Sequence, residues 1–297
     1  KNSIHPLFVY DSEAPPEKKE EQLRRRETRN LIKQKNEQIK LDFEEYKKNN
    51  EVPSELLKEI VSKKTDGKLL ETSKKEFYKI IESEIRKLEI QTISITKEDF
   101  DITKELFNVL GVSYISAPIG GEAEKTCSEL CINGVVDAVM SEDTDVMAYG
   151  TPIFLTKLNT FNSTCIAIEI KKIYKTLEID YNQFRDLCIM CGNDYNTNIP
   201  KVGPISAYNL IKECGSIENI ATFKNIDVSI LKHVRSRELF SIEETSEDVK
   251  NNVKFVKKYL NIQDIQNFLK KYNHNQFLTK IQNIINLKTK LIFLDLN

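Results

Sequence analysis

Residues 112–140 contain the pattern that most restricts the fold of this chain. Val112-Ser-Tyr-Ile115 is a short apolar run typical of a strand, and the turn Ala117-Pro-Ile-Gly-Gly121 follows it. A helical pattern covers residues 122–132, and Val135–Met140 is a second apolar run. Strand, helix and strand in so short a stretch predict a βαβ unit, which joins parallel strands. We therefore expect an α/β fold with a central, mostly parallel sheet flanked by helices.

Carboxylates occupy the helix starts and strand ends of this part of the sequence: Asp11, Glu122, Glu124, Asp143 and Asp145. Strand ends and the helix starts that follow them lie at one edge of an open parallel sheet, so we expect the five to meet there. Taken singly, Glu122 also suits the first turn of a helix and residues 142–145 suit a surface turn. Together they would repel one another unless cations compensate.

Hard cations with oxygen ligands are the usual compensation for such a group of carboxylates. Two Mg²⁺ or Mn²⁺ ions about 4 Å apart can activate a water and stabilise the leaving oxygen in phosphodiester hydrolysis. The sequence therefore predicts a two-ion centre at this edge of the sheet.

A second candidate site lies farther along the chain. Asp194 follows a helical run in Cys191-Gly-Asn-Asp-Tyr195, and Ile199-Pro-Lys-Val-Gly-Pro-Ile-Ser-Ala207 leads into another helix. This order is similar to a helix–hairpin–helix, which binds DNA phosphates through backbone amides and a helix N-terminus, independently of base sequence. The alternative is an ordinary helix–loop–helix with proline turns. Lys201 stands where the hairpin usually has a glycine, so the turn must tolerate a side chain.

A highly charged and mostly helical stretch separates the first strand from the βαβ unit. It opens with a group of basic residues: Lys18, Lys19, Arg24, Arg25, Arg26 and Arg29. Residues 49–55 and 62–67 have the composition of loops. Because its polarity is high all round, we expect this stretch to be a solvated arm without a core of its own.

Composition limits the class of protein. The 297 residues are 40% hydrophobic and 30% charged, which is enough to build a core. No apolar run approaches the ~18 residues of a membrane span and no secretory pattern is present, so we expect a soluble intracellular protein. The net charge of −1 leaves nucleic-acid binding open, because a carboxylate site offsets basic patches. Cys188 and Cys191 form a CxxC without a second half-site, so we interpret them as core thiols.

Taken in order, these motifs resemble the flap endonuclease and XPG family of structure-specific 5′ nucleases. Gly121-Glu-Ala-Glu124 and Val136–Gly150 resemble the internal nuclease block of that family, and Cys191–Ala207 resembles its helix–hairpin–helix. Phe8–Pro16, with the basic helix after it, resembles the end of the N-terminal block. The resemblance extends from about Pro6 to Ile220, interrupted by a longer arm.

The resemblance implies a PIN-like nuclease core, a helical arm that acts as an arch for a free 5′ end, and a helix–hairpin–helix lobe. We divide the chain accordingly into residues 1–16 (end of the N-terminal nuclease block), 17–94 (arm), 95–180 (internal nuclease block), 181–240 (helix–hairpin–helix region) and 241–297 (helical C-terminal region). Lys290–Leu296 is a candidate terminal strand or docking segment.

The same resemblance assigns roles to individual residues. One metal ion is assigned to Asp11, Glu122 and Glu124, and the second to Asp143, Asp145 and Asp194. Lys19 and Arg26 are expected to steer the scissile phosphate with fixed positive charge. Val202 and Gly203 are expected to offer amides to duplex DNA, and a K⁺ ion is expected near Asn198 and Ile199.

The implied activity is that of a 5′ flap endonuclease and 5′–3′ exonuclease, which hydrolyses DNA at flaps or branches by a two-metal-ion mechanism. The protein is expected to act as a monomer, in the nucleus or at another site of DNA replication and repair. The family's first strand and its metal-binding Asp do not precede Lys1, so we expect a fragment, and a protein that binds branches without cutting is the alternative function. Ile205-Ser206 replaces a basic pair after the hairpin, and no sliding-clamp motif ends the chain. Asp143-Thr-Asp145 also resembles the Asp-x-Asp pair of haloacid-dehalogenase-like phosphatases, which would not explain the hairpin.

Overall fold

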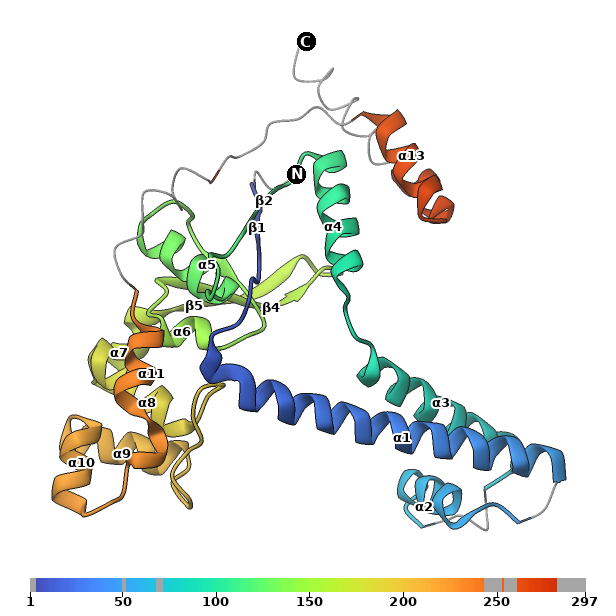
Figure 1. The fold of residues 1–297 in the computed structure, drawn as a ribbon, viewed down its shortest axis with the longest axis horizontal. Coiled ribbons are helices and arrows are strands. Elements are labelled where there is room, and N and C mark those ends of the chain that lie inside the picture. Colours follow the sequence, from blue (N-terminus) through green and yellow to red (C-terminus); the bar gives the residue numbers. More distant parts are fainter. Residues whose placement is uncertain (1–3, 50–51, 68–71, 243–252, 254–260, 282–297) are drawn as a thin grey trace. The chain divides into compact units, whose positions relative to one another are not determined.

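The computed structural model describes residues 4–49, 52–67, 72–242, 253 and 261–281. The chain divides into two compact units, one of residues 1–18 and 98–297 and the other of residues 19–97. We call the first unit the body and the second the arm, and Figure 1 shows the elements of both. In the described part of the chain, no helix combines the length and apolar character needed to cross a membrane.

The strands of the body form two small sheets. β1 (Leu7–Tyr10) pairs in parallel with β2 (Ser113–Ser116). β3 (Val139–Met140) pairs in parallel with β4 (Ile153–Asn159), and β4 pairs antiparallel with β5 (Thr164–Glu169). The α/β class is confirmed, but the predicted parallel pairing of the strands on either side of the helix at 122–132 is wrong. β2 and β3 each take a different partner, β1 and β4, instead of pairing with each other.

The helices of the body are α4 (Lys97–Leu110), α5 (Ala123–Ile132), α6 (Asp145–Ala148), α7 (Ile170–Leu177), α8 (Tyr181–Cys191), α9 (Pro204–Cys214), α10 (Ile217–Lys224), α11 (His233–Phe240) and α13 (Ile262–Lys271), with 3-10 turns η1 (Pro16–Lys18), η3 (Ser229–Leu231) and η4 (Asn275–Phe277). The predicted stops after α4 and α5 are confirmed. Gly111 and Gly134 adopt φ of +63° and +69°, a backbone region in which glycine is not strained.

Two cores hold the parts of the body that matter for the candidate site. The larger one lies among α7 to α11 and includes Ile189, Ile211 and Phe240, all fully buried. A smaller one joins Val139 of β3, Val146 of α6 and Phe154 of β4. Because the smaller core anchors both sides of the segment between β3 and α6, it fixes the backbone that carries the Asp-x-Asp motif.

The arm consists of α1 (Lys19–Asn49), α2 (Glu55–Lys64) and α3 (Lys74–Thr92). Contrary to expectation, it has its own hydrophobic core, with Ile39, Phe43, Leu57 and Ile81 at most 2% exposed. The predicted loop at 62–67 is also helical as far as Lys64.

The arm core escaped prediction because each helix contributes only a narrow apolar stripe. Ile39 and Phe43 lie one helical turn apart on α1, and Phe77 and Ile81 do so on α3, while the other faces are charged. α1 and α3 lie side by side (Figure 1). Three such stripes facing one another bury enough surface to form a core that no single helix could form. The candidate terminal strand at 290–296 lies outside the described residues.

Candidate active site

The end of β1 is tied to the start of α5. The carboxylate of Asp11 accepts a hydrogen bond from the amide of Ala123, the first residue of α5, at 2.9 Å. The hydroxyl of Ser12 donates to the turn before α5, with the Pro118 and Gly121 carbonyls as acceptors. These contacts bring Asp11 to the helix that carries Glu124, as the strand-end argument predicts.

The segment between β3 and α6 is braced on both sides. The amide of Asp145 donates to the Asp143 carboxylate at 2.9 Å, and α6 begins at Asp145. Glu142 lies between β3 and this turn, and its carboxylate accepts the Lys157 amide at 2.8 Å and the Thr156 hydroxyl at 3.3 Å. Glu142 therefore holds the Asp-x-Asp turn against β4.

Two buried hydroxyl groups join α5 to α6. The oxygens of Ser128 and Thr151 lie 2.7 Å apart, and both residues are fully buried. Ser128 also contacts the Glu124 carbonyl at 2.7 Å, and Thr151 contacts the Val146 carbonyl at 2.8 Å. Buried hydroxyls without such partners would cost about 1–3 kcal/mol each. The pair therefore fixes the spacing between the helix that bears Glu124 and the helix that starts at Asp145.

The carboxylates act on one another electrostatically around Glu124. Burial raises the pKa of Glu124, and the negative charges of three neighbours raise it further: Asp11, Asp143 and Glu122. A raised pKa marks a carboxylate whose charge is not fully compensated by the protein.

Asp145 shows the same effect more strongly. Burial raises the pKa of Asp145 to about 7, and the charges of Asp143, Asp194 and Glu122 act in the same direction. Lys18 opposes them by lowering this pKa. All six predicted metal ligands therefore lie within electrostatic reach of Glu124 or Asp145.

Lys18 places a positive charge inside this group. Its ammonium forms ion pairs with Glu122 and, at 2.9 Å, with Asp194. Burial alone would lower the pKa of Lys18, but the hydrogen bonds to the two carboxylates outweigh burial and raise it. Lys18 was not among the predicted site residues, although it stands in the basic group that includes Lys19. The sequence signal for Lys18 was its position just after Pro15-Pro16. In the structure, its amide donates to the Pro15 carbonyl at 3.0 Å.

Two tyrosines also belong to the site and were missed. The hydroxyl of Tyr195 donates to Glu122 and lies 3.4 Å from the hydroxyl of Tyr149. Burial raises the pKa of both phenols, so both remain protonated and able to donate. Phe240 of α11 packs on both rings, with centroid distances of 5.2 and 5.3 Å. The only sequence signal for Tyr195 was its position directly after Asp194.

The donor set fits a hard cation. Every predicted ligand is a carboxylate, which favours Mg²⁺ or Mn²⁺ over metals that prefer thiolate or imidazole. Within the described ranges, no three acidic, histidine or cysteine side chains are arranged so that they could hold one ion as they stand. The Lys18 ammonium accounts for part of this, because it already engages Glu122 and Asp194.

Lys19 and Arg26 lie on α1 in the arm, and both side chains are exposed. The role predicted for these two residues stays a prediction.

The predicted hairpin lies between α8 and α9. Lys201 adopts φ +66°, so the turn holds a lysine in the left-handed region that the motif usually gives to glycine. The Val202 amide donates to the Ile199 carbonyl at 3.0 Å, so it closes the turn and is not free for DNA as predicted. Gly203 is the N-cap of α9 and Pro204 follows it. The amides at this helix end left without intrahelical acceptors are those of Gly203, as predicted, and of residues 205 and 206.

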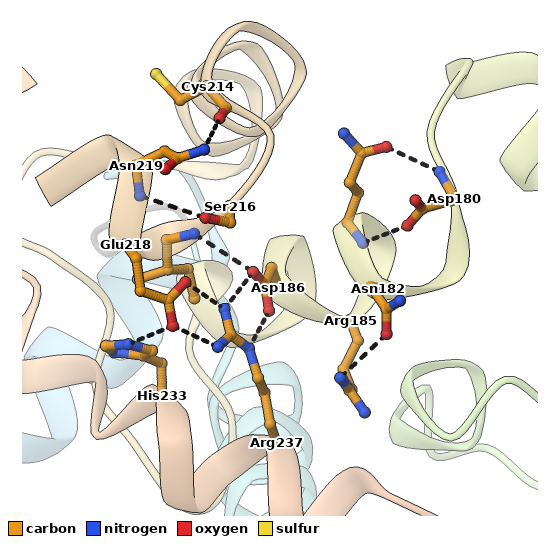
Figure 2. A network of polar contacts seen from close by, with 12 residues as sticks. Asp180, Asn182, Arg185, Asp186, Cys214, Ser216, Glu218, Asn219, His233 and Arg237 are labelled. Carbon is orange, nitrogen blue, oxygen red and sulfur yellow. Dashed lines mark hydrogen bonds and ion pairs between the residues drawn. The ribbon is translucent and has the colours of Figure 1, made fainter. Parts of the chain in front are cut away.

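An ion-pair network ties α8, α10 and α11 together (Figure 2). Arg237 donates two hydrogen bonds of 2.6 Å to Asp186 and two of 2.5 and 2.9 Å to Glu218. Asp186 also accepts the Ile217 amide at 3.3 Å, and its side chain is only 5% exposed. His233 lies 3.2 Å from Glu218. The network fixes three helices next to the hairpin.

Comparison with known proteins shows which family this chain resembles. Residues 111–194 match the XPG I-region family model. Probable RAD2-like endonuclease 076L of Invertebrate iridescent virus 3 is 35% identical over 270 residues, which are 82% of this chain and 70% of that protein. Putative RAD2-like endonuclease 095R of Frog virus 3 is 31% identical over 80% of this chain and 66% of its own length. Flap endonuclease 1 of Komagataella phaffii is 40% identical over 46% of this chain and 37% of its own length.

Solved structures show the same fold at lower identity. The catalytic core of Rad2 in complex with DNA substrate gives a TM-score of 0.58 at 18% identity, over 90% of this chain and 73% of that one. Flap endonuclease-1 from Methanococcus jannaschii gives 0.52 at 23% identity, over 65% and 60%. The fold is that of an α/β, PIN-like core. The chain belongs to the XPG/RAD2 family of endonucleases, which confirms the family predicted from its motifs.

Proposed function

We propose that this chain is a structure-specific endonuclease that hydrolyses phosphodiester bonds of branched DNA at a 5′ flap. The observation that supports it most is electrostatic. Six carboxylates from separate segments act on one another around Glu124 and Asp145, with one lysine between them. A group of charges that repel one another costs stability, and such groups persist at sites that bind cations.

We assign two Mg²⁺ or Mn²⁺ ions to this group. Asp11, Glu122 and Glu124 would hold one, and Asp143, Asp145 and Asp194 would hold the other. Bound there, the ions supply an activated water and stabilise charge on the leaving oxygen. The protein itself keeps the two halves of the group in register. The buried hydroxyls of Ser128 and Thr151 link their helices, and a Glu142 contact braces the Asp-x-Asp turn.

Lys18 is the basic residue that we place nearest the reacting phosphate. Its ammonium pairs with carboxylates of both halves of the group. From this position the ammonium could pair with a phosphate on which negative charge develops. The phosphate-steering roles predicted for Lys19 and Arg26 are retained as proposals beside that of Lys18.

The hairpin provides the contact to duplex DNA in this proposal. The amides of Ile205 and Ser206 lie in the first turn of α9, where the helix dipole favours a phosphate. Such a contact is independent of base sequence, so it suits a protein that recognises the shape of a branch. Binding should therefore weaken steeply as salt is added, because phosphate contacts release counterions.

The test is cleavage of a labelled double-flap DNA by this chain, in Mg²⁺ and in EDTA. We expect a discrete 5′ product in Mg²⁺ and intact DNA in EDTA. Equal cleavage in both would refute the metal-dependent mechanism. Intact DNA in Mg²⁺, with the chain still bound to the branch, would refute the nuclease proposal and favour a protein that binds branches without cutting.

A further inference from the structure

Helix α11 carries two arginines that reach different parts of the body. Arg237 is held by Asp186 of α8 and Glu218 of α10 (Figure 2). Arg235 donates instead to Glu17 of η1, with 2.7 Å between its Nε and the carboxylate. Residues two positions apart on a helix do not face each other, so α11 can bridge the helix–hairpin–helix region and η1.

Glu17 and Lys18 are neighbours in the same short turn. η1 contains only Pro16, Glu17 and Lys18. The proline ring fixes φ at one end of the turn, and the bond from the Lys18 amide to the Pro15 carbonyl closes the other. In a turn this short, a contact that fixes Glu17 also restricts the backbone from which the Lys18 side chain extends.

These contacts connect α8, α11 and η1 one after another. Asp186 lies within α8 and holds α11 through Arg237. Arg235 on the same helix holds Glu17, and Lys18 next to it pairs with Asp194, which follows α8. The first of these contacts therefore involves α8 and the last involves the loop that follows α8.

We propose that Arg235 is a positioning residue for Lys18: through Glu17 it holds η1 so that the Lys18 ammonium lies between Glu122 and Asp194. The role of Lys18 in catalysis rests on the function proposed above, but the positioning does not. The proposal joins the helices around the hairpin to the turn that carries the lysine.

The competing explanation is that the Arg235–Glu17 pair is a solvent-screened surface ion pair with no effect on Lys18. The Arg235 side chain is 53% exposed and also pairs with Glu238 at 2.8 Å, and exposed pairs contribute little to stability. Glu17 argues for the positioning role. Its Oε2 is buried and accepts no hydrogen bond from the described residues, and the Arg235 hydrogen bond is the main cause of its lowered pKa. Arg235 is thus the donor that compensates a partly buried carboxylate.

The first experiment compares single-turnover cleavage of flap DNA in Mg²⁺ with the Kd for the same DNA in EDTA. We expect Arg235→Ala to lower the single-turnover rate about tenfold, with little change in Kd, because a displaced catalytic group slows chemistry more than binding. Arg235→Lys should restore most of the rate, since an ammonium can still donate to Glu17. Glu238→Gln removes the other partner of Arg235 and serves as the control, with an expected change of less than about twofold.

A double-mutant cycle shows whether Arg235 acts through Lys18. In a Lys18→Ala background, Arg235→Ala should cause no further loss, because the residue to be positioned is gone. Losses that add in the double variant would overturn the proposal. So would a wild-type rate for Arg235→Ala alone.

A readout independent of cleavage separates this proposal from the nuclease function. Acylation of lysines in the DNA-free protein, read by mass spectrometry, should modify Lys18 faster in Arg235→Ala than in the wild type, with other lysines unchanged. Equal modification of Lys18 would overturn the positioning role even if the wild type cuts DNA. Faster modification in a protein that does not cut DNA would support the positioning role and reject only the nuclease.

Discussion

The Lys18 ammonium lies 2.9 Å from the Asp194 carboxylate and also pairs with Glu122. One cation supplied by the chain itself therefore pairs with two carboxylates that we assign to different metal ions. A divalent ion that took up the same carboxylate oxygens would compete with this contact. Lys18 thus stabilises the metal-free protein and competes with the metal for the same oxygens.

Lys18→Met should make this competition measurable. We expect Mg²⁺ to raise the Tm of the variant more than that of the wild type, because a ligand stabilises in proportion to RT ln(1 + [L]/Kd). Cleavage should fall by about 100-fold, the loss typical of a removed electrostatic donor. Lys175→Met, at an exposed position of α7, is the control. Equal Mg²⁺-induced Tm shifts in all three proteins would rule out the competition.

Asp145→Asn should abolish cleavage while leaving DNA binding measurable. Asp145 lies within reach of four other charged groups of the site, and we assign it to a metal ion directly. The loss in single-turnover rate should exceed the roughly 10- to 100-fold typical of outer-shell partners of a metal. Asp137→Asn, an exposed carboxylate outside the group, should cut normally. If Asp145→Asn cut as fast as that control, the metal assignment would be wrong.

Arg237→Ala should destabilise the body strongly. It leaves Asp186, whose side chain is 5% exposed, without its bidentate partner, and breaking such a buried pair costs about 3–5 kcal/mol. The measurement is denaturant unfolding followed by a probe in the body. Lys172→Ala removes an exposed pair with Glu169 and should cost well under about 1 kcal/mol. Similar losses for the two variants would contradict the buried character of the network.

Glu218 should make the stability of the body depend on pH in the acid range. Hydrogen bonds from Arg237 lower the pKa of Glu218 from 4.5 to about 2. A lowered pKa means that the stabilisation is present above 4.5 and is lost as pH falls from 4.5 toward 2. The full difference would be roughly 3 kcal/mol. Because the Glu218 side chain is 51% exposed, screening reduces it to roughly 1 kcal/mol.

The check on Glu218 is the free energy of unfolding of the wild type and of Glu218→Gln between pH 5 and pH 2.5. The wild type should lose roughly 1 kcal/mol more than the variant over this range. Parallel curves for the two proteins would show that Glu218 is not perturbed.

Ile81→Ala should loosen the arm without affecting the body. Ile81 is fully buried in the arm core, and removing such a side chain costs about 2–5 kcal/mol. Hydrogen exchange of the whole chain should show lost protection in α1, α2 and α3, with protection in α8 and α9 unchanged. Leu31→Ala, 66% exposed on α1, is the control. Loss of protection across both units would contradict a separate core.

The parts of the fold that depend on local signals could be predicted from the sequence. The helix after the Gly120-Gly121 turn and the glycine stops at Gly111 and Gly134 follow from periodicity and backbone preference, which neighbouring residues decide. Strand pairing does not follow from such local signals. β1 and β2 are paired although their residues lie on opposite sides of the arm in the sequence, and nothing local in residues 113–116 indicates which edge they take.

The candidate site shows the same limit at the scale of one residue. Strand ends and helix starts led to five of the six carboxylates, because sheet topology brings those positions together. The sixth, Asp194, was assigned from the family resemblance. The Lys18 ammonium reaches Glu122 and Asp194 from the last residue of η1, and α1 begins at the next residue. One residue of helix turns a side chain by about 100°, so a boundary one residue away would turn the Lys18 side chain in another direction. Composition cannot give a boundary to that precision.

The separate core of the arm has a consequence for how this protein can change over generations. Phe43, Leu57 and Ile81 pack with one another in a core made of arm residues. Substitutions, insertions and deletions on the solvent side of the arm therefore leave the nuclease core undisturbed, and selection can act on the two units independently. A lineage could replace the whole arm while inheriting the same chemistry.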